Sequence, residues 1–139
     1  MDPYTIFADI VAGRAPASFV YEDDDVVAFM DIRPWTPGHL LVIPRTPARS
    51  LAELPPEMGG KLFQVGQRLA AALRDSEVAC DGVNFFLADG VAAGQEVFHV
   101  HLHVIPRTRG DGIGLRGHPR NARREDLDYL AASIRRGVS

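Results

Sequence analysis

The sequence predicts an α+β domain, on three observations. Short β-prone runs follow one another with compact turns, which is typical of an antiparallel sheet. One long segment and two shorter ones have the apolar spacing of amphipathic helices. The 139 residues are 46% hydrophobic and 24% charged, the composition of one soluble globular domain. We therefore expect a single domain over residues 1–139, with its core in about 4–107 and a Gly- and Arg-rich connection plus a helix in 108–139.

The N-terminal part predicts one helix and three strands. Asp2 and Pro3 are residue types that favour an N-cap and a first helical position, and Gly13 supplies a stop. The β-prone runs 19–21 and 26–30 flank an acidic segment that is typical of a hairpin turn. The apolar run 39–43 follows a loop rich in proline, and it predicts a strand covered on both faces.

The remainder predicts the main helix, two further strands and a last helix. Apolar residues recur every three or four positions through 58–73, which marks the main amphipathic helix. Residues 83–87 and 97–105 are strand candidates separated by a loop of small residues, 88–94. A C-terminal helix is expected around 127–134. The order therefore gives an antiparallel sheet of about five strands with three helices.

The bulk composition excludes several classes of protein. A net charge of −3 gives no overall attraction to nucleic acid or to an anionic membrane, and no apolar run approaches the roughly 20 residues of a membrane span. Cys80 is the only cysteine, so neither an intrachain disulfide nor a zinc site built on a cysteine pair is possible. The first residues lack the pattern of a signal peptide. We expect a cytoplasmic protein.

Three of the five histidines fall within five residues, at His99, His101 and His103. Side chains alternate across a strand, so the three imidazoles share one face. The apolar residues between and after them share the other face, which can pack on a core; they are Val100, Leu102 and Val104. An imidazole face on a core strand indicates a functional site.

Two kinds of chemistry fit this face. Neutral imidazole is a common metal ligand, and neighbouring pairs could chelate one ion. Imidazole also serves as a nucleophile and as a hydrogen-bond or proton donor at phosphorus. The preceding loop favours the second possibility, because Gly90 and Gly94 allow N–H groups to converge on an anion and Gln95 can donate to phosphate oxygen.

The run 94–107, GQEVFHVHLHVIPR, resembles the signature of the histidine triad (HIT) superfamily, His-φ-His-φ-His-φ-φ with φ apolar. The segments 6–7, 21–23, 29–32 and 38–44 resemble further landmarks of that family in the expected order. The resemblance implies a HIT-like fold and a nucleotide hydrolase, active at the α-phosphorus of a nucleoside phosphoramidate or a related AMP or GMP ester.

The resemblance also implies roles for the histidines. His101 would be the nucleophile of a nucleotidyl-histidine intermediate, with Nδ1–H bonded to a backbone carbonyl and Nε2 free to attack. His103 would hydrogen-bond the phosphate or the bridging oxygen. His99 would support the nucleophile, and His39 would be an additional supporting histidine.

A binding site for a purine nucleotide is implied as well. Asp31 would accept hydrogen bonds from the ribose hydroxyls, although an aspartate there also suits a turn. Gly94, Gln95 and Glu96 would lie at the phosphate. An apolar slot would take the base; its residues would be Ile6, Phe7, Ile10, Phe29, Ile32 and Leu41. No metal or other cofactor is implied, and the family suggests a homodimer.

The chain departs from the family pattern at three places. Thr5, Ala8 and Pro47 occupy the positions of the cysteines and histidine of a structural zinc site, so we expect no zinc. Ala88 removes a side-chain amide near the phosphate, and Glu96 replaces a hydroxyl. Three alternatives stay open: a dinucleoside polyphosphate hydrolase, a nucleotide-binding protein with little turnover, which Ala88 and Glu96 motivate, and a metal-dependent hydrolase with the histidines as ligands. His103, where a glutamine would suggest a transferase, favours hydrolysis.

Overall fold

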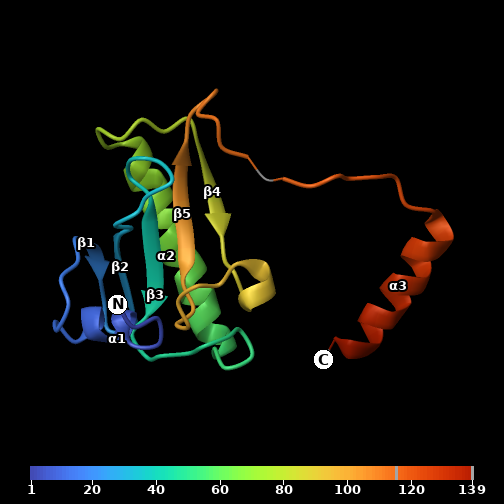
Figure 1. Ribbon diagram of the computed structural model, residues 1–139, viewed down its shortest axis with the longest axis horizontal. Coiled ribbons are helices and arrows are strands. Elements are labelled where there is room, and N and C mark those ends of the chain that lie inside the picture. The colour runs from blue at the N-terminus through green and yellow to red at the C-terminus, as the bar shows by residue number, and fades with distance from the viewer. Residues whose placement is uncertain (115, 139) are drawn as a thin grey trace.

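A computed structural model describes residues 1–114 and 116–138 (Figure 1). All five strands pair antiparallel in one sheet, in the order β1-β2-β3-β5-β4. The strands are β1 Phe19–Glu22, β2 Val26–Met30, β3 Leu40–Pro44, β4 Gly82–Phe86 and β5 Leu102–Arg107. The predicted α+β class and the predicted order of elements are confirmed, and β3 is buried at every position, as its continuous apolar run predicts.

Helix α2, Pro56–Arg74, lies against one face of the sheet (Figure 1). Its buried residues recur at helical spacing and pack on the inward side chains of the central strands. Val100, Leu102 and Val104 belong to this core, which confirms the apolar face predicted for the histidine segment. The opposite face of that segment is therefore free to build the site.

Helix α1, Ile6–Val11, covers part of the other face through Phe7 and Ile10. The expectation that Asp2 is its N-cap is wrong, because the helix begins four residues later. Asp2 instead closes the preceding turn, where its Oδ1 accepts the N–H of Tyr4 at 2.8 Å and its carbonyl accepts the N–H of Ile6 at 2.9 Å. This turn places α1 beside the histidine segment.

The histidine strand is shorter than predicted. Strand β5 begins at Leu102, so His99, at a bend, and His101, in irregular chain, lie ahead of it. The pairing with β3 stops there because Pro44 has no backbone N–H to donate. Its carbonyl oxygen instead accepts a hydrogen bond from Nε2 of His99, at 2.8 Å. The backbone N–H of Val100 donates a hydrogen bond to the carbonyl of Ala48 instead of to β3.

Two further elements are neither strands of the sheet nor helices packed on it. The loop after β4 contains a short 3-10 helix, η1 Val91–Ala93, where only irregular chain was predicted. Helix α3, Arg124–Gly137, follows a long connection and stands apart from the sheet (Figure 1). Within residues 1–114 and 116–138, no helix is both long and apolar enough to cross a membrane.

Candidate active site

A cavity of about 760 Å³ opens on the sheet face opposite α2. It brings together His101, His103, Asp31 and the glycine loop. Every residue of the predicted apolar slot lines it; they are Ile6, Phe7, Ile10, Phe29, Ile32 and Leu41. Gly94 and Glu96 line it too, whereas Gln95, His99 and His39 lie behind its wall. The cavity therefore brings together the residues that the sequence assigned to the apolar slot, and His101 and His103.

Several lining residues were not predicted. The most conspicuous are Trp35, from the loop before β3, and Phe86, at the end of β4. The others are Met1, Ala15, Pro16, Ala17, Met30, Arg33 and Val97. The proline-rich loop signalled rigidity around Trp35, but nothing in its spacing signalled that it faces the site. Phe86 follows from the register, since it pairs directly with His103.

The imidazole of His101 is held in one tautomer. Its Nδ1 lies 2.7 Å from the carbonyl oxygen of His99. A carbonyl can only accept, so Nδ1 carries the proton and Nε2 carries the lone pair. His99 is fixed in the same way, with its Nε2–H donating to the carbonyl of Pro44. The hydrogen bond expected for His101 is present, and its acceptor is the neighbouring triad residue.

A second hydrogen-bonded chain fixes His103. The backbone N–H of Trp35 donates to Nδ1 of His39 at 3.0 Å, so a neutral His39 carries its proton on Nε2. That Nε2–H lies 2.9 Å from Nδ1 of His103 and donates to it. The proton of His103 is therefore on Nε2. One ring thus has a free lone pair, and its neighbour has a free N–H, with ring centroids 4.9 Å apart.

Burial keeps these histidines neutral. Burial is the largest of the effects that lower the pKa of His103 to about 4; the neighbouring His101 and His39 add to the shift, and Asp31 opposes it. Burial also lowers the pKa values of His101, His39 and His99. At neutral pH both rings are thus uncharged, and His101 presents a lone pair while His103 presents an N–H.

The two carboxylate oxygens of Asp31 have different surroundings. Its Oδ1 accepts the N–H of Arg33 at 2.8 Å, the turn interaction that the sequence left open. Its Oδ2 lies 3.6 Å from Nε2 of His39, and the residue lines the cavity. The carboxylate can therefore steady the histidine chain while it accepts hydrogen bonds from a ligand.

The glycine loop has the backbone that its sequence predicts. Gly90 and Gly94 have φ of 99° and 94°, which favours glycine. Gln95 acts inside the loop, because its Oε1 accepts from the N–H of Gly90 while its Nε2 donates to the carbonyls of Arg49 and Val97. Its side chain holds the loop together, and its expected contact with phosphate stays a prediction.

The departures from the family pattern occupy different places. Ala88 is buried, so its methyl group packs inside the fold. Glu96 is exposed on the rim of the cavity, and its carboxylate lies 3.9 Å from the guanidinium of Arg33. Arg33 thus balances the charge that Glu96 brings to the rim.

Asp31, His39 and His103 are the residues that could hold a metal ion, with one possible ligand atom each within 4.8 Å of the others. Nε2 of His39 and Nδ1 of His103 already share a hydrogen bond. A metal ion there would have to displace the proton that holds His103. The three triad histidines are not grouped around one point, which disfavours the metal-dependent alternative.

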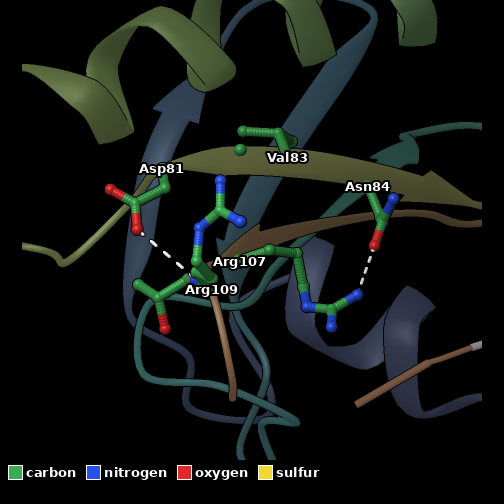
Figure 2. A pocket seen from close by; sticks show the side chains of 7 residues that line it. Asp81, Val83, Asn84, Arg107 and Arg109 are labelled. Atoms are coloured by element: carbon green, nitrogen blue, oxygen red, sulfur yellow. Dashed lines mark hydrogen bonds between the residues drawn. The ribbon is translucent and has the colours of Figure 1, made fainter. Parts of the chain in front are cut away.

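A second pocket lies at the ends of β4 and β5, away from the histidines (Figure 2). Arg107 crosses it and is already paired, with Asn84, with Asp111 and with the carbonyl of Ile113. Asp81 holds the backbone N–H of Arg109 at the other end. These groups satisfy one another, so the histidine cavity is the better candidate site.

The comparisons with known proteins agree with this geometry. Residues 12–110 match the HIT domain. The chain is a HIT protein. Protein Hit of Bacillus subtilis is 42% identical over 132 residues, which cover 93% of this chain and 90% of that protein. Adenylylsulfatase HINT3 of Arabidopsis thaliana is 31% identical over 135 residues, 94% of this chain and 68% of the plant protein.

Solved structures confirm the HIT-like fold. A HIT family protein from Bacillus anthracis matches this HIT protein with a TM-score of 0.88 and 38% identity, over 96% of both chains. A histidine triad nucleotide-binding protein from Candida albicans matches with a TM-score of 0.85 and 26% identity, over 95% of both. Membership of the family supports a nucleotide-binding role of the hydrolase type.

Proposed function

We propose that this HIT protein hydrolyses a purine nucleotide conjugate, a nucleoside phosphoramidate or a related AMP or GMP ester, through a nucleotidyl-His101 intermediate. The observation that carries the proposal is the hydrogen bond from Nδ1–H of His101 to the carbonyl of His99, which leaves the lone pair on Nε2 inside the cavity. The names of the plant adenylylsulfatase and of the Candida nucleotide-binding protein support the same class of ligand.

The reaction has two displacements. Nε2 of His101 attacks the α-phosphorus; the bond from phosphorus to the leaving group breaks, and the leaving group departs with the bonding electrons and with a proton taken from solvent. Water then attacks phosphorus, the Nε2–phosphorus bond breaks, the electron pair returns to Nε2, and the water proton passes to solvent. His103 donates from Nε2–H to a phosphoryl or bridging oxygen in both steps, which stabilises the charge that develops there.

The nucleotide occupies the cavity along its apolar wall. Phe7 and Phe29 meet edge to face with centroids 5.5 Å apart, and Phe7 lies 5.1 Å from the ring of His101. A base held there lies beside the nucleophile, with Asp31 in place for the ribose hydroxyls. The described residues carry out these steps without a cofactor.

The decisive experiment uses adenosine 5′-phosphoramidate and follows AMP release over many turnovers. We expect His101→Ala to lower turnover by about 10³-fold or more, and His103→Ala by about 10²-fold. His118→Ala is the matched control, because His118 is exposed in the connection before α3. Base-quenched wild-type protein is expected to carry an adenylyl group on His101 by peptide mass spectrometry.

Two results would overturn the proposal. One is undiminished AMP release by His101→Ala. The other is tight AMP binding by the wild type with no turnover of the phosphoramidate or of a dinucleoside polyphosphate, which would favour the binding protein. Preferential turnover of the polyphosphate would select that alternative hydrolase.

We also propose a homodimer, with the cytoplasm as the expected compartment on the sequence grounds given above. Helix α3 supports the dimer, because Leu127, Leu130 and Ile134 form an exposed apolar stripe. A 14-residue helix is marginally stable alone in water and needs a surface to cover that stripe. The 96% overlap with the Bacillus anthracis chain includes most of residues 116–138, so the α3 segment is part of the shared architecture.

A further inference from the structure

The side of the cavity away from the apolar slot is also aromatic. The register pairs Phe29 with Leu41, Leu41 with His103, and His103 with Phe86. Directly paired residues share a face, so these four side chains form a row across neighbouring strands, about 5 Å apart per strand. Phe86 therefore lies across His103 from the slot proposed for the base.

Trp35 extends this row outward. Its ring centroid lies 6.1 Å from that of Phe86, and the Phe86 centroid lies 5.6 Å from that of His103. Trp35 is 56% exposed and lines the cavity that contains His101 and His103. A large apolar side chain on the wall of a cavity is available to a ligand.

The loop that carries Trp35 is held by hydrogen bonds at two adjacent residues. The N–H of Trp35 is bonded to His39, and Oγ1 of Thr36 donates to the carbonyl of Pro106 at 2.7 Å. Pro34 and Pro37 restrict the backbone on either side. The indole thus has a fixed support, as a recognition surface needs.

In a displacement at phosphorus, the nucleophile and the leaving group lie on opposite sides of the phosphorus atom. With the base in the slot beside Phe7, the leaving group is directed past His103 toward Phe86 and Trp35. Arg33 and Glu96, both exposed in the lining of this cavity, lie 3.9 Å apart and offset each other's charge. An uncharged planar ring fits this surface better than a charged or aliphatic group.

We propose that Trp35 and Phe86 form a leaving-group subsite that selects conjugates whose leaving group carries an aromatic ring. The subsite deepens the proposed function, since it rests on hydrolysis at the same histidines. It accounts for an exposed tryptophan that the nucleotide alone does not use. Trp35 is a specificity-determining residue here, and the reaction steps remain those given above.

The kinetic experiment compares two adenosine 5′-phosphoramidates, of 2-phenylethylamine and of 2-cyclohexylethylamine, which differ only in the aromaticity of the ring. We expect the wild type to favour the aromatic one by about tenfold in kcat/KM. Trp35→Leu should bring this ratio close to one, and Trp35→Phe should keep part of it. Inhibition by AMP should not change in Trp35→Leu, because the slot for the base is intact.

A binding experiment separates the subsite from turnover. Trp35 is the only tryptophan of the chain, so its fluorescence reports directly on the subsite. We expect adenosine 5′-O-benzylphosphonate, which has no bond for the enzyme to cleave at the ring, to shift the emission and to bind about tenfold tighter than its cyclohexylmethyl counterpart. AMP should bind with little change in emission.

The outcomes distinguish the two proposals. Turnover of both phosphoramidates at equal kcat/KM, with equal binding of the two phosphonates, overturns the subsite and leaves the proposed function standing. Selective binding of the benzylphosphonate without turnover of either phosphoramidate shows a site for aromatic rings at Trp35, but it overturns the proposed function and, with it, the role of that site in selecting a leaving group. A Trp35→Leu protein that becomes monomeric in light scattering, with an unchanged substrate ratio, shows instead that a second copy covers the indole.

Discussion

At the scale of residues, hydrogen-bond partners decide what each histidine can do. His101 is buried with its Nδ1–H committed to a carbonyl, so it exposes a lone pair. His103 receives a hydrogen bond on Nδ1 from His39, so it exposes an N–H. The same type of side chain thereby presents a lone pair at one position and an N–H two residues later. The tautomers follow from the backbone groups of His99 and Trp35.

The activity is expected to persist in mild acid. Protonation of His101 removes the attacking lone pair, and burial lowers the pKa of His101 below the ordinary histidine value of about 6.5. The acid limb of kcat/KM, which reports on the free enzyme, should therefore lie below pH 6.5. His103, with its pKa of about 4, stays neutral through this range.

The measurement is kcat/KM for adenosine 5′-phosphoramidate between pH 4 and 9, corrected for the hydrolysis of the substrate without enzyme. A limb centred at or above pH 6.5 would show that the nucleophile is not buried as described. Asp31 and His39 face the same rings, and His39→Asn should move the limb without abolishing it.

At the scale of elements, the distance between α2 and the sheet depends on one glycine. A Cβ on Gly66 would lie 3.0 Å from Cζ of Phe85 and 3.2 Å from Cδ2 of Leu102. A side chain at this position would require Phe85 and Leu102 to move by a few tenths of an ångström. The face behind the histidine segment is therefore packed tightly, which steadies the site on the other side of the sheet.

Gly66→Val should lower the free energy of unfolding by about 1–3 kcal/mol, because the added carbons overpack this contact. Gly60→Val is the matched control on the same helix, since a Cβ at Gly60 meets nothing within 4 Å. Its free energy of unfolding should stay within about 0.5 kcal/mol of the wild type. Urea denaturation measures both; equal effects of the two substitutions would contradict the described packing.

The periodicity of the sequence predicted which side chains share a face. Contacts between residues far apart in the sequence decided where β5 starts and which strand residues reach the site. The alternation of His99 to Val104 placed the histidines and the core residues on the correct faces. The start of β5 could not be predicted, because it depends on the carbonyl of Pro44, 55 residues away from the ring of His99. Phe86 is an ordinary strand residue by pattern, and only its register with His103 brings it into the site.

At the scale of the whole molecule, α3 is the helix that no packing against the rest of the described chain stabilises. None of its residues is buried, and it lies apart from the sheet (Figure 1). Its acidic first turn and basic last turn stabilise the helix ends. Its apolar stripe is not covered by other described residues of the same chain. We therefore propose that a second copy of the chain covers this stripe.

Leu130→Asp combined with Ile134→Asp should convert the dimer to monomer, because charged side chains cannot be buried in an apolar contact without a large cost. Multi-angle light scattering measures the mass directly. Tyr129→Asp is the control, since Tyr129 is exposed on the opposite side of the helix from this stripe. An unchanged dimer in the double variant would exclude α3 from the interface.

The order of the strands has a consequence for how the chain folds. The β1–β2 hairpin joins residues close in sequence, whereas β3 pairs with β5 through Leu40 and Val104, with the whole of α2 between them. Closing so long a loop is slow compared with forming a local hairpin. His39 and His103 meet only across this closure. During refolding, catalytic activity should therefore return later than the helical signal, with the slowest kinetic phase.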